Sequence, residues 1–173
     1  MIAVYIRAAR EYVEGKYGFL GRALVQQTWL LTIDEFPDDE IKIPLPPLQG
    51  VNAVRYDDSA GNEQTVSPDD YYVDTASEPG WVVRNTSASW PTPLDAINAV
   101  RVEFIAGYAP DTGSSPVDYT ANIPFNIKAA MLLMIADLMD RRNENFETSL
   151  APNTGHAGAD RLLRRHKIDK SMA

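Results

Sequence analysis

The chain has 173 residues, of which 45% are hydrophobic and 23% are charged, and its formal net charge is −8. These values are typical of one globular domain, with or without an arm, and they exclude a globally disordered chain. The absence of cysteine excludes disulfide frameworks, thiolate zinc sites and cysteine nucleophiles. The longest apolar run, residues 129–136, is too short to cross a bilayer, and the amino-terminal residues lack signal-peptide features. We therefore expect a soluble protein made in the cytoplasm, with no membrane partner.

The first predicted element is a helix over residues 2–17. Apolar residues recur there at steps of three or four positions, the spacing of one helix face. Gly18 follows, and glycine commonly ends a helix because it adopts a left-handed backbone without steric cost. The apolar positions are Ile2, Ile6, Ala9, Val13 and Tyr17.

The middle of the chain, residues 28–105, is predicted to be rich in β-strands. Short β-branched or aromatic runs alternate there with clusters of proline, glycine and acidic residues. The cluster from Asp57 to Asn62 predicts a hairpin turn with Gly61 at a positive φ. Aromatic side chains remove large apolar areas from water, so we expect Trp29, Tyr56, Trp81 and Trp90 to pack this region. The strand candidates are residues 28–33, 41–43, 51–56, 63–66, 71–73, 81–83 and 100–105.

The strongest helix signal covers residues 124–142. Pro124 suits a first helical turn, and apolar residues then cover most of the helix circumference. A helix of this kind is expected to be buried on several sides. We therefore predict that Phe125, Leu132 and Leu133 lie in the core, and that truncating either leucine to alanine costs about 2–5 kcal/mol.

Charge is unevenly distributed along the chain. Residues 34–78 contain twelve acidic and two basic residues, whereas residues 155–173 contain five basic and two acidic residues. An acidic body argues against sequence-specific DNA binding, which requires cations that neutralise phosphates. Residues 153–173 are predicted to form a flexible basic arm that becomes helical from Ala159 to Lys167 on assembly.

Motifs that carry catalytic or cofactor chemistry do not emerge from the sequence. The three glycines between residues 15 and 21 do not have the spacing of a nucleotide-binding loop. His156 and His166 lie outside any zinc-binding helix motif, so we expect no metal and no cofactor. A carboxylate pair such as Asp69 and Asp74 leaves a hydrolase open as the alternative from another functional class.

Several short segments, in their order and spacing, carry a family resemblance. Between residues 8 and 152 the chain resembles the head–tail connector family, also called adaptor or head-completion proteins, of long-tailed bacteriophages and phage-like gene transfer particles. Members of that family usually begin with a further helix, whereas this chain starts within what resembles the second one. The segments are Gln27–Trp29, Ile43–Leu48, Val54–Asp57, Asp70–Asp74, Ser89–Pro91, Val102–Tyr108, Pro124–Leu133 and Asp140–Arg142.

The resemblance implies an α+β fold, with a helical core made by the N-terminal helix and the long buried C-terminal helix, and with a β-rich antiparallel insertion. It also implies a non-enzymatic role in the virion neck, after assembly in the host bacterial cytoplasm. Copies of such proteins, usually twelve, form a ring beneath the portal of a DNA-filled head and meet the next neck or tail protein. DNA would pass through the ring without specific binding. A tail terminator or another neck ring protein is the alternative.

On this interpretation residues 1–152 form the connector domain and residues 153–173 form the basic C-terminal arm. The basic residues and leucines of the arm are expected to contact the portal or a neighbouring subunit. Two exposed acidic loops are expected to face the channel or a neighbour. The arm contacts are Arg161, Leu162, Leu163, Arg164, Arg165 and Lys167, and the loop acids are Asp34, Glu35, Asp38, Asp39, Glu40, Asp57 and Asp58.

Overall fold

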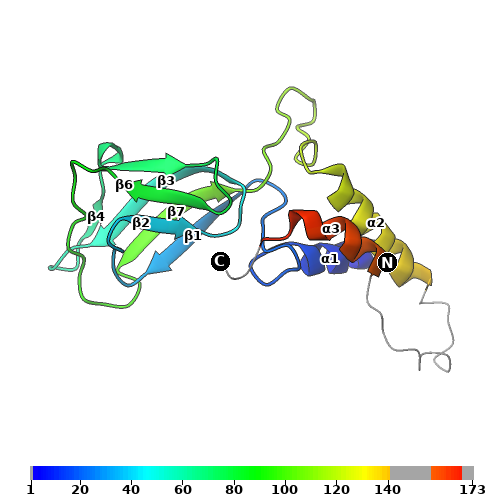
Figure 1. Ribbon diagram of the computed structural model, residues 1–173, viewed down its shortest axis with the longest axis horizontal. Helices are drawn as coiled ribbons and strands as arrows, with labels where there is room; N and C mark the ends of the chain where they lie inside the picture. The colour runs from blue at the N-terminus through cyan, green and yellow to red at the C-terminus, as the bar shows by residue number, and fades with distance from the viewer. Residues whose placement is uncertain (1, 141–156, 169–173) are drawn as a thin grey trace. The chain divides into compact units, whose positions relative to one another are not determined.

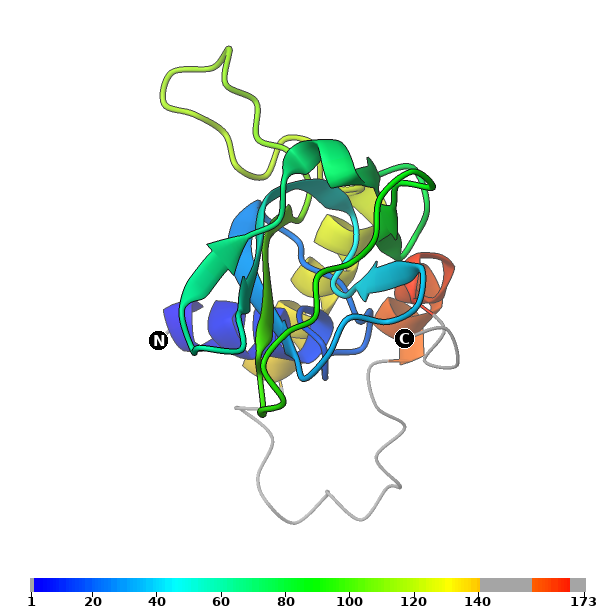
Figure 2. The ribbon, with the colours of Figure 1, turned by 90° about the vertical axis from the view of Figure 1, so that its left-hand side faces the viewer.

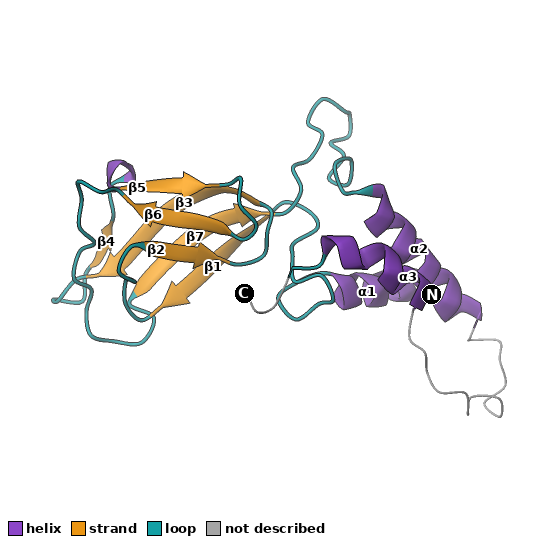
Figure 3. Ribbon diagram, in the orientation of Figure 1, coloured by secondary structure: helices purple, strands orange, loops and turns teal. Residues whose placement is uncertain are grey.

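The computed structural model describes residues 2–140 and 157–168, which form two compact units (Figures 1 and 3). The helical unit contains residues 2–22, 123–140 and 157–168, and the β unit contains residues 23–122. Helices and antiparallel sheets together confirm the predicted α+β class. Within the described ranges, no helix combines the length and the apolar character needed to span a membrane.

The β unit is built from two antiparallel sheets. One sheet has the strand order β1-β7-β3-β4 and the other has the order β2-β6-β5. Each strand lies within three residues of a segment predicted from its β-branched and aromatic residues. The strands are β1 (Gln27–Ile33), β2 (Glu40–Ile43), β3 (Leu48–Asp57), β4 (Glu63–Thr65), β5 (Tyr71–Asp74), β6 (Gly80–Arg84) and β7 (Val100–Ala106), with the 3₁₀ turn η1 (Pro68–Asp70) before β5.

The core of the β unit lies between the two sheets, which Figure 1 shows as two layers. Alternate side chains of a strand point to the same face, and in β7 every second residue is buried. Phe104 is the largest fully buried side chain among the described residues. The buried cluster draws from both sheets and includes Ile41, Ile43, Val54, Tyr71, Val82, Val102, Phe104 and Ala106.

Aromatic side chains close one edge of this core. Trp29, Tyr56 and Trp90 are half-buried and contact the core cluster. Phe36 stacks on Trp90 with 4.9 Å between the ring centroids, and it meets Tyr56 edge-on at 6.0 Å. Trp81 lies outside this group, half-buried beneath the ammonium of a lysine on the adjacent strand β2.

The chain enters and leaves the two sheets of the β unit through segments that lie side by side. The backbone N–H of Tyr108 donates to the carbonyl of Leu24 at 3.1 Å, and Val25 pairs with Tyr108 in a parallel bridge. Gly107 has a φ of +109°, and a Cβ at this position would lie 2.1 Å from the carbonyl oxygen of Val25. Glycine is therefore required where the two segments meet.

The helical unit consists of α1 (Ile2–Val13), α2 (Phe125–Asp140), α3 (Ala157–Leu163) and the 3₁₀ turn η4 (Arg164–His166). Helix α2 contacts both α1 and α3, and Tyr12 of α1 donates a hydrogen bond to Asp160 of α3. The buried residues come from all three helices, from the segment after α1 and from the residue before Pro124. They include Ala9, Val13, Leu20, Arg22, Ile123, Ile127, Ala130, Met134, Ala159 and Leu163.

Helix α1 ends at Val13, four residues before the predicted end. Gly15 is the left-handed residue, with a φ of +93°, and its N–H donates to the carbonyl of Arg22. Gly18 serves a different purpose, because a Cβ there would lie 2.2 Å from the carbonyl oxygen of Glu14. Tyr17 is consequently outside the helix and is 90% exposed. The glycine that ends the helix is therefore Gly15, and Gly18 permits a close backbone approach.

The prediction that α2 buries Phe125, Leu132 and Leu133 is wrong for the single chain. These side chains are 78%, 65% and 50% exposed, whereas Ile127 and Met134 are buried on the opposite side. The reason is that α1 and α3 cover only one side of a helix that is apolar all round. Truncating either leucine to alanine should therefore cost the single chain far less than a core truncation.

The described part of the predicted arm, residues 157–168, is helical from residue 157 to residue 166 and belongs to the helical unit rather than standing apart. Leu163 is fully buried in the core of that unit. The N–H of Ile168 donates to the carbonyl of Leu20 at 2.9 Å, and Arg22 Nε donates to the carbonyl of His166 at 2.7 Å. The arm residues 153–156 and 169–173 lie outside the described residues.

Candidate functional site

The first predicted acidic loop, residues 34–40, divides its carboxylates between two uses. Asp34 Oδ1 accepts a hydrogen bond from the backbone N–H of Asn98 at 2.8 Å. Asp39 Oδ1 pairs with Arg84 Nη2 at 2.6 Å. These two acids hold the loop to other parts of the β unit. Within the described part of the chain, the exposed carboxylates of Glu35, Asp38 and Glu40 form no such bond.

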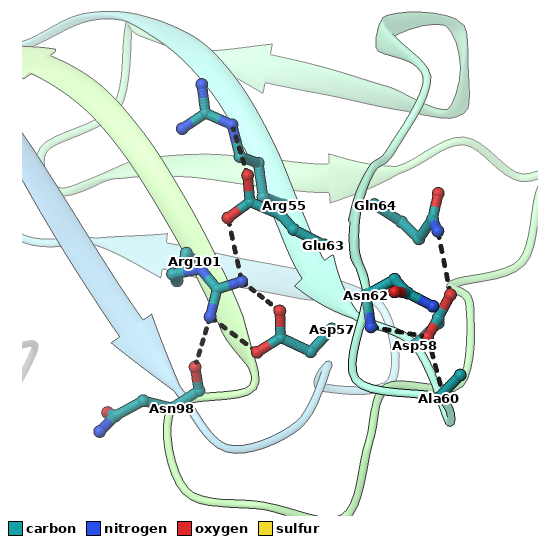
Figure 4. A network of polar contacts seen from close by, with 9 residues as sticks. All are labelled: Arg55, Asp57, Asp58, Ala60, Asn62, Glu63, Gln64, Asn98 and Arg101. Atoms are coloured by element: carbon teal, nitrogen blue, oxygen red, sulfur yellow. Dashed lines mark hydrogen bonds and ion pairs between the residues drawn. The ribbon is translucent and has the colours of Figure 1, made fainter.

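The second predicted acidic loop is tied to the sheet by a network of ion pairs, drawn in Figure 4. Arg101 on β7 donates to Asp57 Oδ2 at 2.9 Å and to Glu63 Oε2 at 3.1 Å. Since Asp57 ends β3 and Glu63 begins β4, one guanidinium joins both strands of the hairpin to β7. The hydrogen bond from Arg101 lowers the pKa of Asp57.

A second ion pair, between Arg55 on β3 and Glu103 on β7, continues this network. Glu103 on β7 accepts hydrogen bonds from Asn52 Nδ2 at 2.8 Å and from Arg55 Nη1 at 3.1 Å. These two hydrogen bonds lower the pKa of Glu103. The carboxylates of the network therefore stabilise the pairing of β3, β4 and β7, which the sequence did not reveal.

Asp58 shapes the hairpin turn itself. Its Oδ1 accepts the N–H groups of Ala60 and Asn62 at 2.9 and 3.0 Å, and its Oδ2 accepts Gln64 Nε2 at 2.9 Å (Figure 4). The hydrogen bonds from Asn62 and Gln64 lower the pKa of Asp58. Gly61 has a φ of +79°, which confirms its predicted turn position. Asp58 is therefore a turn-forming residue, whatever surface the loop meets.

The carboxylate pair considered for a hydrolase is not assembled into a catalytic site. Asp69 lies in η1, before the four-residue strand β5, and Asp74 is the last residue of that strand, so the two acids lie toward opposite ends of it. Asp74 Oδ1 accepts the backbone N–H groups of Ala76 and Ser77, and the hydrogen bonds from this turn lower the pKa of Asp74. A carboxyl group with a lowered pKa is a poor proton donor at neutral pH. Among residues 2–140 and 157–168, no cluster of three or more His, Asp or Glu is arranged to hold a metal.

Two open depressions mark the surface beside the first acidic loop. One, of about 480 Å³, is lined by Asp34, Glu35 and residues 92–97, and Ile97 there is 82% exposed. The other, of about 440 Å³, lies beside Trp90 and Arg84.

The C-terminal turn carries an exposed basic face, composed of Arg161, Arg164, Arg165 and Lys167. We call these four residues the basic face. Lys167 Nζ lies 5.0 Å above the ring of Phe19. Leu163 was predicted to offer an apolar contact to a partner, but it is buried within the helical unit. Leu162 is half-buried, so charge dominates this surface.

A second surface of the helical unit is apolar, and the sequence did not identify it as a surface. Phe125, Leu132 and Met139 recur at intervals of seven residues on α2 and are 78%, 65% and 41% exposed. Leu133 lies beside them and is half exposed. We call these four residues the apolar stripe. A soluble monomer rarely exposes several large apolar side chains together, so such a stripe indicates an interaction surface.

The two units carry opposite net charge. Over its described residues, the helical unit has nine basic and five acidic residues, a net charge of +4. The β unit, residues 23–122, has four basic and sixteen acidic residues, a net charge of −12. Each unit therefore favours a partner of a different charge.

Three solved structures contain chains with the same fold. A chain in the virion of the native gene transfer agent particle matches with a TM-score of 0.71 and 20% identity, over 98% of this chain and 77% of that chain. A chain in the neck of the native particle, computed with C12 symmetry, matches with a TM-score of 0.65 and 22% identity, over 98% of this chain and 82% of that chain. A chain in the neck of the empty particle, computed with C6 symmetry, matches with a TM-score of 0.68 and 22% identity, over 98% of this chain and 78% of that chain.

These matches establish a shared fold that extends over nearly the whole chain. Comparison with protein-family models and with curated protein sequences gives no match. The family resemblance noted in the sequence is therefore supported at the level of fold by chains from gene transfer agent particles, including their necks.

Proposed function

We propose that this chain is a non-enzymatic structural protein of the neck of a phage-like particle. Copies of it form a ring that joins the portal of the DNA-filled head to the next neck or tail protein. The observation that carries the proposal is the fold shared over 98% of the chain with chains of gene transfer agent virions and necks. The resemblance of residues 8–152 to connector proteins supports the same role. A ring of twelve agrees with the C12 symmetry of one matched neck structure.

The charge of the β unit suits a channel through which DNA passes. Each copy contributes a net charge of −12 from residues 23–122. A wall of this charge repels phosphates, so DNA is expected to slide through the ring without specific binding. The exposed carboxylates of Glu35, Asp38 and Glu40 are the loop acids best placed to contribute, because Asp57 and Asp58 already bind within the β unit.

The basic face is the proposed contact with the portal or a neighbouring subunit. Its four cations are exposed, whereas Leu163 is committed to the core of the helical unit. Reversing Arg161, Arg164 and Arg165 to glutamate should abolish portal binding, and raised salt should weaken wild-type binding. Reversal of Arg7 and Lys16, two exposed cations of the same unit, is the matched control. Unchanged binding by the triple variant would exclude the basic face as the anchor.

The proposed function is tested by mixing the purified chain with portal-bearing heads and with isolated tails. Electron microscopy should show rings at the portal vertex, and heads carrying those rings should accept the downstream protein. Rings on the ends of isolated tails would instead identify a tail terminator. Metal- or pH-dependent hydrolysis by the monomer, without rings on either particle, would favour an enzyme.

A further inference from the structure

The loop between β7 and α2 is a preformed projection of the β unit. We call residues 109–122 the finger; Figure 2 shows it extending away from the strands of the β unit. Asp111 and Asp118 pair through two backbone hydrogen bonds of 2.8 and 3.2 Å. Ser114 Oγ accepts the N–H of Asp118 and donates to the carbonyl of Asp111, each at 2.9 Å. The finger therefore has a defined shape before it meets any partner.

The finger presents apolar side chains together with negative charge. Val117 and Tyr119 are 39% and 55% exposed. Residues 109–122 include Asp111 and Asp118 and contain no lysine or arginine. At the base, Asn122 Nδ2 donates to the carbonyl of Ala109 at 2.9 Å, which closes the loop. Such a surface fits a partner that is apolar and carries positive charge.

We propose that the finger of one copy docks on the apolar stripe of the next copy in the ring, an inference that rests on the proposed function. The stripe is apolar, as are Val117 and Tyr119 of the finger. The charges on α2 itself are mixed (Lys128, Asp137 and Asp140), so the complement to the acidic finger is the net charge of +4 that the described residues of the helical unit carry as a whole. Contact between the stripes of two copies would instead bring together two helical units of the same net charge, which repel each other. The finger and the stripe are different surfaces of one chain, so their contact is heterologous and can repeat from copy to copy until a ring closes.

Docking would place Val117 and Tyr119 against Phe125, Leu132 and Leu133 of the neighbouring copy. The chain contains no cysteine, so single cysteines can report this contact without background reaction. Tyr119→Cys and Leu132→Cys chains, one of them carrying a size tag, are mixed and treated with a short bismaleimide linker. Thr86→Cys, at an exposed turn of the β unit, replaces Tyr119→Cys in the matched control.

The expected result is a mixed Tyr119→Cys/Leu132→Cys product that exceeds both self-linked products and the Thr86→Cys control several-fold. It should be lost when the Leu132→Cys chain also carries Phe125→Asp. A dominant Leu132→Cys self-product would show that stripe meets stripe and would overturn the proposal. A chain that carries both Tyr119→Cys and Leu132→Cys is treated in the same way. If its two cysteines link only within one chain, a chain's own finger occupies its stripe, and the proposal is overturned. A Tyr119→Cys/Leu132→Cys product no more abundant than the Thr86→Cys control product also overturns the proposal.

A second measurement separates this inference from the proposed function. Tyr119→Asp and Leu132→Asp chains are each tested for ring formation on portal-bearing heads, and wild type is tested in parallel. We expect rings with wild type and none with either variant. Normal rings with both variants would overturn finger docking while leaving the neck function intact. An absence of rings with wild type, despite the expected crosslink, would count against the neck function alone.

Discussion

The β unit and the helical unit treat apolar side chains differently. In β7, Val102, Phe104 and Ala106 are at most 1% exposed, because they belong to the core cluster between the two sheets. In α2, Leu132 is 65% exposed, because α1 and α3 cover only the side that carries Ile127 and Met134. The same residue types therefore complete a core in one unit and leave an interaction surface in the other.

The sharpest test of this difference compares two phenylalanines. Phe104→Ala in the β unit should destabilise the chain by about 3–5 kcal/mol, because the side chain is fully buried. Phe125→Ala on the apolar stripe should change the free energy of unfolding of the single chain little, while weakening ring formation. Urea denaturation and electron microscopy of rings measure the two effects. Similar destabilisation by both variants would show that α2 is buried in the single chain.

The next effect distinguishes two adjacent leucines of α3. Leu163→Ala should cost about 2–5 kcal/mol, because Leu163 is fully buried in the helical unit. Leu162→Ala, its half-buried neighbour, should cost clearly less. Urea denaturation of both variants compares them directly. A negligible loss for Leu163→Ala would restore the interpretation of residues 157–168 as a detached arm.

A smaller effect should appear in acid and concern the β unit. The folded pKa of Asp57 lies below the ordinary value of 3.8, so its ion pair stabilises the fold above that value. This contribution is lost as the pH falls from about 5 through 3.8 and on through the lowered pKa. Arg101→Met should reduce stability at pH 6 and show a shallower decline in acid. Equal pH slopes for wild type and Arg101→Met would contradict this account.

The smallest expected effect on stability is at the exposed acids of the first loop. The triple change Glu35→Gln, Asp38→Asn and Glu40→Gln should alter the free energy of unfolding by less than about 0.5 kcal/mol per site. Asp39→Asn, which loses the pair with Arg84, is the control that should cost more. DNA retention in assembled particles measures the functional effect. If retention is also unchanged, these acids only aid solubility.

The β unit was largely predictable from the sequence, because its signals are local. Most strands contain several β-branched or aromatic residues, and β4 (Glu63–Thr65), which has only one, follows directly from the turn that Gly61 occupies. The ion pairs of Arg101 were not predictable. They join residues 44 and 38 positions apart, and which charges meet depends on strand register.

The helical unit was predicted less well for a physical reason. Apolar residues surround α2, so their periodicity locates the helix but does not indicate which side is buried. The seven-residue interval of Phe125, Leu132 and Met139 was visible in the sequence, yet it suits a core face equally well. After α1, three glycines follow one another closely, and only the backbone shows that Gly15 ends the helix.

The close approach of Gly107 and Val25 has a consequence for how such proteins can diverge. The segment that forms the two sheets begins and ends at one point, where Leu24 and Tyr108 are joined by a backbone hydrogen bond. The segment between Leu24 and Tyr108 can therefore change in length or be replaced as a whole, provided that its two ends return to that point. Recombination can then supply different sheets that recognise a different neighbour. The helical unit keeps its own contacts in that exchange.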